Sequence, residues 1–261
     1  MWIVPNLIFA VLALFSFGFF ALHLKKTWFS LSTVGKGVEE NRLDSPLIRL
    51  RNMFLWGGLQ GRMFKEIVPA LMHFAIFWGF ITVSLGTFET LLHGLFSSFT
   101  MEALLGTGNL FSAYLFSQDI ANFLVALAIG FAVARRLFFP PKRFKNLKKS
   151  SKNDALIILG LIFGLVFTSL VYLGAFSFSG TTIDPTKVAL SSFVVQMIFG
   201  TFGVTSPEAW GIIASLFWWV HCLTLFSFML YLPFSKHQHL IWVWPNMFFK
   251  HFKSTGRIRP M

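Results

Sequence analysis

Five long apolar segments divide this chain, and they constrain its fold more than any other feature. They cover residues 2–24, 67–92, 112–133, 155–176 and 208 to about 240. A helix needs about 20 apolar residues to cross a bilayer, so each segment is long enough to span. The whole chain is 55% hydrophobic and only 12% charged, about half the charge of a typical soluble domain. The sequence therefore predicts an all-α integral membrane protein, a bundle of five transmembrane helices.

Basic residues gather in three short stretches between or after these segments. Of the 22 Lys and Arg, eight lie within residues 25–65, eight within 135–152 and five within 236–259. Such clustering is typical of cytoplasmic loops of a membrane protein, and it argues against a nucleic-acid groove as the reason for the net charge of +12. We expect a prokaryotic cytoplasmic (inner) membrane protein with its N-terminus outside and its C-terminus inside. The basic stretches would then face anionic lipid or a soluble partner.

The segments outside the spans indicate how the chain is organised. Because Lys25 and Lys26 follow the first apolar segment, we expect a retained span and not a cleaved secretory signal. Residues 47–64 mix charged and apolar side chains, which favours a partly helical segment at the membrane surface. Residues 177–207 contain an apolar run too short to span, which favours an outer-surface or re-entrant segment. We divide the chain into a membrane domain, residues 1–240, and a cytoplasmic tail or linker, residues 241–261.

Two pairs of histidines lie at matching depths in the second and fifth spans. His221 and His239 are 18 residues apart, so on one continuous helix both rings face the same side, about 27 Å apart. Pro233 lies between them and can kink the helix, so the shared face is approximate. His73 and His93 are 20 residues apart, near the two ends of the second span. Because the two helices run antiparallel, pairing by depth joins His73 with His239 on the inside and His93 with His221 on the outside. Histidine within a membrane helix is costly, and two stacked bis-histidine sites would explain all four residues.

Haem b suits this arrangement better than other metal groups do. It takes two axial imidazoles in an apolar cavity and needs no covalent attachment. The chain has a single cysteine, Cys222, so it offers no c-type haem motif and cannot by itself hold an iron–sulfur cluster. Zinc is less well supported, because few cysteines or carboxylates accompany the histidines. We expect two haem b groups between the second and fifth spans, with His73 and His239 as inner iron ligands and His93 and His221 as outer ones.

The outer pair has a geometric difficulty. A straight helix rotates His93 about 200° from His73, onto nearly the opposite face. His93 can serve only if Gly79 or Gly86 distorts the helix, or if the helix ends before Leu92. The histidines near helix ends or off the shared face are expected to be ordinary solvated side chains: His23, His237 and His251.

Charged side chains near the expected sites have two interpretations each. Glu89 and Asp119 lie in the outer parts of the second and third spans. Quinol oxidation releases protons, and a carboxylate beside the outer haem would accept them, so both are candidate catalytic residues; the alternative is a solvated acid at a helix end. On the inside, four arginines either pair with haem propionates or serve only as topology charges: Arg49, Arg51, Arg135 and Arg136.

The last span resembles a known family. The spacing from His221 to His239, closing with LPFSKHQH, is similar to the final helix of the respiratory nitrate reductase gamma subunit, a five-span dihaem b cytochrome. In that family two ligands lie on the second span and two on the fifth. The second span departs from it, because that family places its two ligands ten residues apart, and the residue ten beyond His73 is Val83.

The second span is more similar to a related group. The stretch MHFAIFWGFITVSLGTFETLLHGL resembles cytochrome b domains like the heterodisulfide reductase membrane subunit, which are often fused to an iron–sulfur oxidoreductase. In that group a Gly-Thr pair precedes a later histidine, as Gly86 and Thr87 precede His93 here. The resemblance therefore implies that His93 is the outer ligand. The tail WPNMFFKHFKSTGRIRPM resembles the linker into the iron–sulfur part of such fusions.

Together these features predict a membrane dihaem b cytochrome. It would pass electrons between a membrane quinone and a cytoplasmic iron–sulfur or flavin oxidoreductase, with the quinone near the outer haem as the resemblance implies. The alternative is a non-redox membrane transporter or scaffold subunit whose histidines handle protons or support structure. Intramembrane Lys or Arg and broken half-helices would favour that alternative, and the apolar segments show neither clearly.

Overall fold

A computed structural model describes residues 6–34, 41–61, 63–140 and 148–252. Nearly all regular structure in them is helical, and five helices are long and apolar enough to cross a membrane. Four of them overlap the apolar segments closely, and each extends past the expected bounds. The five are α1 (Asn6–Val34), α3 (Ile67–Leu95), α5 (Asn109–Phe138), α6 (Lys149–Ser177) and α8 (Pro207–Tyr231).

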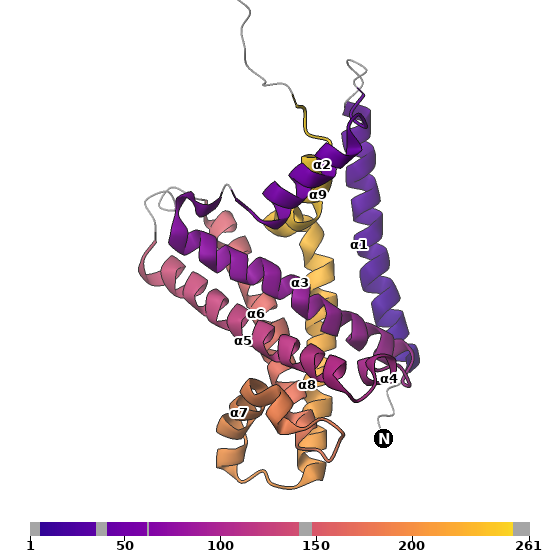
Figure 1. Ribbon diagram of the computed structural model, residues 1–261, viewed down its shortest axis with the longest axis vertical. Coiled ribbons are helices and arrows are strands. Elements are labelled where there is room, and N and C mark those ends of the chain that lie inside the picture. Colours follow the sequence, from indigo (N-terminus) through magenta and orange to yellow (C-terminus); the bar gives the residue numbers. More distant parts are fainter. Residues whose placement is uncertain (1–5, 35–40, 62, 141–147, 253–261) are drawn as a thin grey trace, which may run out of the picture.

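Short elements cover the two ends of this bundle (Figure 1). The end that carries Arg135 and Arg136, here called the basic end, holds α2 (Pro46–Met53), η1 (Phe54–Gly58), η2 (Met63–Lys65) and α9 (His239–Phe248). The opposite end, here called the α7 end, holds α4 (Met101–Leu105), η4 (Pro185–Val188), α7 (Ala189–Ile198) and η5 (Gly200–Phe202). Residues 47–64 are thus partly helical, as expected.

Helix α6 is the central helix, and it packs against α5, α7 and α8. Its buried Ile158 and Ile162 share a core with Val125 of α5 and Leu225 of α8. Close approach depends on small residues, as is usual between membrane helices. A Cβ at Gly174 of α6 would lie 2.3 Å from the Ser191 carbonyl oxygen of α7, so only glycine fits there.

The fifth span ends nine residues earlier than expected, at Tyr231 instead of Leu240. Pro233 is the cause, because proline has no N–H and its ring clashes with the preceding turn. Two 3₁₀ turns follow, η6 (Leu232–Phe234) and η7 (Lys236–Gln238), and α9 begins at His239. The prediction that His221 and His239 share one continuous helix face is therefore wrong. The expected domain boundary at residue 240 also falls inside α9.

The apolar run within residues 177–207 forms α7, which packs on α5 and α6. Asp119 of α5 anchors its first turn. The carboxylate accepts the backbone N–H groups of Leu190 at 2.9 Å and Ser191 at 2.8 Å, and also the Ser191 hydroxyl at 2.5 Å. Since the first N–H groups of a helix have no partner within it, Asp119 satisfies donors that would otherwise be buried and unpaired.

Candidate functional site

His73 and His239 face each other at the basic end. Their ring centroids are 6.3 Å apart, with 40° between the ring planes. The Nδ1 of His73 lies 3.1 Å from the Gln60 side-chain oxygen, and the Nδ1 of His239 lies 3.1 Å from the Lys236 carbonyl oxygen. Because these oxygens only accept, each Nδ1 carries the proton and each Nε2 keeps a free lone pair. Both rings are therefore in the tautomer that a metal ligand requires.

The distance between the two rings suits one metal ion between them. A metal–imidazole bond is about 2 Å long, so two rings that bind one ion from opposite sides have centroids about 6 Å apart. Both rings also line one cavity of about 1180 Å³, part of which is open to the outside. Its wall combines apolar side chains such as Met72 and Ile158 with Arg135 and Arg136. This cavity, the inner cavity, pairs imidazoles with an apolar wall and cationic groups, which is the chemistry that holds a haem.

A third histidine, His237, lies in the same cavity, although it was expected to be solvated. Its ring centroid is 5.0 Å from that of His239. Burial and the nearby ring of His239 lower the pKa of His237 to about 4, so the ring is neutral at neutral pH. The helix break at Pro233 turns this ring inward, and an uninterrupted helix would have pointed it away. The proline was therefore the signal in the sequence that could have placed His237 here.

His221 is fully enclosed in the middle of the bundle. Its Nδ1–H donates to the Leu165 carbonyl at 3.0 Å, and the Thr168 hydroxyl lies 3.1 Å from the same nitrogen. Its Nε2 is buried and has no hydrogen-bond partner among the described residues. His221 lines a cavity of about 410 Å³, the middle cavity, which Asn122 and Val83 also line. A buried unpaired nitrogen is costly, and a metal ion bound to it would relieve that cost.

His93 opens onto a different cavity. Helix α3 runs without interruption to Leu95, so it does not end before Leu92. The Nδ1–H of His93 donates to the Phe99 carbonyl at 2.9 Å, and the ring packs edge-on against Trp218 at 6.2 Å. This outer cavity has a volume of about 870 Å³, part of which is open to the outside, and it shares the lining residues Ser169 and Tyr172 with the middle cavity.

The structure therefore brings the inner pair together and leaves the outer pair in adjoining cavities. Within the described residues, the aromatic ring contacts of His93 and His221 are with Trp218 and Tyr172, not with each other. Two of the predicted ligands thus have the geometry of a shared site. The pairing of the other two stays a prediction.

The two candidate acids have different surroundings. Glu89 lines the outer cavity beside His93. Its carboxylate accepts the Tyr114 hydroxyl at 2.5 Å and the Met101 backbone N–H at 2.6 Å. Asp119 is only 2% exposed and directs its oxygens at α7, away from the cavities. Of the two, Glu89 has the position that proton exchange with a ligand in the outer cavity requires.

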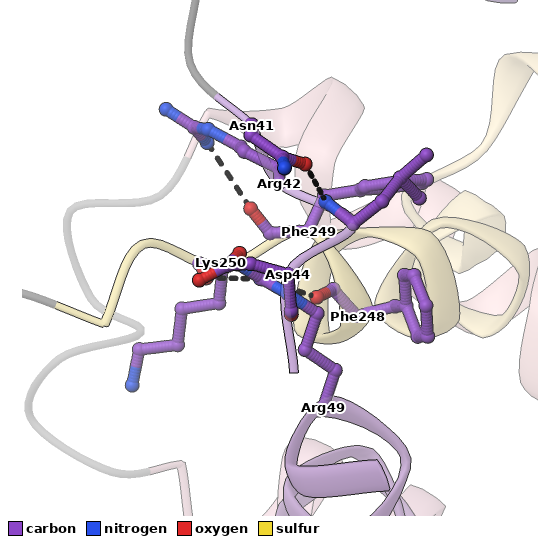
Figure 2. Close-up of polar contacts among 8 residues, drawn as sticks. Asn41, Arg42, Asp44, Arg49, Phe248, Phe249 and Lys250 are labelled. Atoms are coloured by element: carbon purple, nitrogen blue, oxygen red, sulfur yellow. Dashed lines mark hydrogen bonds and ion pairs between the residues drawn. The ribbon is translucent and has the colours of Figure 1, made fainter. Parts of the chain in front are cut away.

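The four arginines also separate. Arg135 and Arg136 line the inner cavity, whereas Arg51 is exposed on α2. Arg49 is 3% exposed and donates to backbone carbonyls at the end of α9, as Figure 2 shows. The candidate arginines that share the inner cavity with the histidines are therefore the two on the third span. No group of three or more His, Cys, Asp or Glu suited to a metal ion occurs within the described ranges.

Two oxidoreductases are similar to this chain in sequence. The probable iron–sulfur-binding oxidoreductase FadF of Bacillus subtilis is 30% identical over 199 residues, which cover 76% of this chain and 26% of that protein. The EtfAB:quinone oxidoreductase of Syntrophomonas wolfei is 24% identical over 258 residues, which cover 98% of this chain and 34% of that protein. This chain thus spans about a quarter to a third of the length of these relatives. No family model and no solved structure matches the chain.

These similarities support an oxidoreductase-related chain with a general role in electron transfer. They agree with five helices suited to a membrane, since one relative is described as acting on quinone, a membrane-soluble redox carrier.

Proposed function

We propose that this chain is a membrane cytochrome b that carries electrons between a quinone and a cytoplasmic iron–sulfur or flavin oxidoreductase. The observation that carries the proposal is the inner pair. His73 and His239 come from helices far apart in the sequence, and their rings are spaced for one iron, with Nδ1 of each already bonded. The iron–sulfur and quinone activities in the names of the two relatives support the two ends of this path.

In this proposal His73 and His239 would hold the inner haem b, which would supply a one-electron couple when bound. The side chains of this chain set its environment. Gln60 and the Lys236 carbonyl fix the ring orientations through Nδ1, and Arg135 and Arg136 offset the negative charge of the propionates. The apolar wall excludes water.

A second haem b with His93 and His221 as ligands remains our prediction for the outer site. The buried, unpaired Nε2 of His221 supports it on the side of α8. The quinone is proposed to bind near the outer haem, against the aromatic wall of the outer cavity that includes Phe111 and Tyr172. There Glu89 is placed to accept a proton released by the quinol, and Tyr114 holds its carboxylate in position.

Optical spectroscopy of the purified protein tests the proposal. We expect a b-type α-band in the reduced-minus-oxidised spectrum and two haems per chain by pyridine haemochrome. His73→Leu and His239→Leu should each remove one haem. His23→Leu is the matched control, because His23 lies at the same end but packs on Phe19 and Phe234.

The same measurements separate the alternatives. A protein without any haem band would sink the cytochrome proposal and favour a non-redox transporter or scaffold subunit. Loss of a haem in His221→Leu but not in His93→Leu would keep the cytochrome and overturn the outer pairing.

A further inference from the structure

Residues 41–61 lie across the basic end and touch both helices that carry the inner histidines. This segment, here called the strap, contains α2 and η1. Both elements pack against α9, and Figure 1 shows α2 and α9 side by side at the top of the bundle. The strap then leads into η2 and α3, the helix of His73. Its position alone makes it a candidate for holding the two ligands in register.

Gln60 connects the strap to His73 directly. Its side chain is 5% exposed, and its oxygen accepts from the His73 Nδ1–H at 3.1 Å. Its backbone has a φ of 54°, a left-handed conformation that is unfavourable for a residue other than glycine. The fold thus accepts local strain at the residue that orients this imidazole, as is common at functional sites.

Arg49 connects the strap to α9. Its guanidinium donates to the carbonyls of Phe248 at 3.0 Å and Lys250 at 2.8 Å (Figure 2). It also lies over the Phe252 ring, 4.3 Å from the ring centroid. Asp44 fixes the same guanidinium by accepting through its backbone and carboxylate oxygens. The last carbonyls of a helix have no partner within it and carry partial negative charge, so a buried arginine there caps α9 firmly.

Helix α9 connects the residues that Arg49 holds to His239, the second proposed ligand. It has ten residues and begins at His239, and Arg49 holds its opposite end. Arg42 adds a further bond from the strap, to the Phe249 carbonyl at 3.1 Å. Ten helical residues span only about 15 Å, so fixing the C-terminal end of α9 limits how far His239 can move, even though Pro245 interrupts the hydrogen bonds between the two ends.

We propose that the strap positions both axial ligands of the inner haem: Gln60 orients His73 directly, and Arg49 fixes α9 and thereby His239. The inference rests on the proposed function, because it takes the inner pair as haem ligands. Gln60 and Arg49 are positioning residues, since neither would touch the iron.

The Gln60 arm is tested by the midpoint potential of each haem in a redox titration. In Gln60→Leu the His73 Nδ1–H loses its acceptor, the ring becomes a poorer electron donor, and the inner potential should rise. In Gln60→Glu a carboxylate accepts the same proton, the ring becomes more basic, and the potential should fall below wild type. The outer potential should not change, and Gln196→Leu in α7 should leave both unchanged.

Opposite shifts from the two variants are the signature of a hydrogen bond to the ligand, because a general loss of packing would move both variants in one direction. If the two variants shift the inner potential in the same direction, or not at all while both haems are bound, the Gln60 assignment fails.

The Arg49 arm is tested by amide hydrogen exchange of α9 in the full chain, a measurement that needs no haem. Arg49→Ala should speed amide exchange of the α9 residues that carry an N–H, which are 239–248 without Pro245, by about tenfold or more, since the end of α9 loses its caps. Arg49→Lys keeps the charge but not the two-carbonyl fork, so it should give an intermediate rate. Arg51→Ala, on the same helix but exposed, is the matched control.

An unchanged amide exchange rate of α9 in Arg49→Ala would overturn the inference that Arg49 fixes this helix. If the purified protein holds no haem, the proposed function fails, whereas the exchange experiment still decides whether the strap fixes α9. The two failures are therefore distinguishable.

Discussion

At the scale of single residues, the two acids that look alike in sequence differ in what surrounds them. Glu89 borders the outer cavity, and Tyr114 donates to its carboxylate. Asp119 is buried among the first backbone donors of α7. A cavity-facing acid can exchange protons with a ligand, whereas an acid that satisfies a helix start supports structure. The two roles predict opposite outcomes for similar substitutions.

Glu89→Gln should slow quinol-linked haem reduction by about 100-fold while the haem content stays the same, because an amide cannot accept the proton. Stopped-flow reduction by a soluble quinol analogue measures this rate. Glu102→Gln is the control, since the Glu102 carboxylate accepts from the exposed Thr182 hydroxyl at the same end. Equal rates in Glu89→Gln and wild type would remove Glu89 from the proposed mechanism.

Asp119→Asn should lower the free energy of unfolding by about 2 kcal/mol, because the amide N–H₂ group faces backbone donors that then remain unpaired. Thermal unfolding in detergent, followed by circular dichroism, detects the change, and Glu102→Gln should stay within about 0.5 kcal/mol of wild type. Normal unfolding combined with slow quinol oxidation would instead place Asp119 in proton handling.

At the scale of elements, contact between helices depends on a few positions without a side chain. Gly174→Ala places a Cβ against the Ser191 carbonyl, which is backbone and cannot rotate away. The variant should lose about 1–3 kcal/mol of stability through displacement of α7. Gly160→Ala, on the same helix with open space around it, should be neutral or slightly stabilising. Thermal unfolding of Gly174→Ala and Gly160→Ala compares their stabilities, and an equal loss of stability in the two variants would contradict the packing argument.

The sequence predicts how deep a residue lies in the membrane better than it predicts the direction in which its side chain points. Hydrophobic runs placed all five long helices, because length and apolarity depend on the bilayer and not on the neighbours. The predicted depth also placed His73 close to His239, since each lies near the end of its apolar segment that adjoins basic residues. The argument from a shared helix face failed at Pro233, because 3₁₀ turns reset the direction of every side chain after it. Burial of Arg49 was also not predictable, because its carbonyl partners lie about 200 residues away in the sequence.

At the scale of the whole molecule, the predicted orientation gives a labelling pattern. The one cysteine, Cys222, is fully buried, so the native chain should not react with a membrane-impermeant maleimide. Ser150→Cys, exposed at the start of α6, should be labelled only in inverted membrane vesicles. Thr205→Cys, exposed before α8, should be labelled only in right-side-out vesicles. The reverse pattern would overturn the predicted orientation with the N-terminus outside.

The interruption of the last span at Pro233 also places His221 and His239, one ligand of each proposed haem, on two separate helices that can move independently. His221 belongs to a helix locked into the bundle core, whereas His239 belongs to a separate short helix on its surface. A soluble partner that displaces α9 would therefore change the midpoint potential of the proposed inner haem and leave that of the outer haem unchanged.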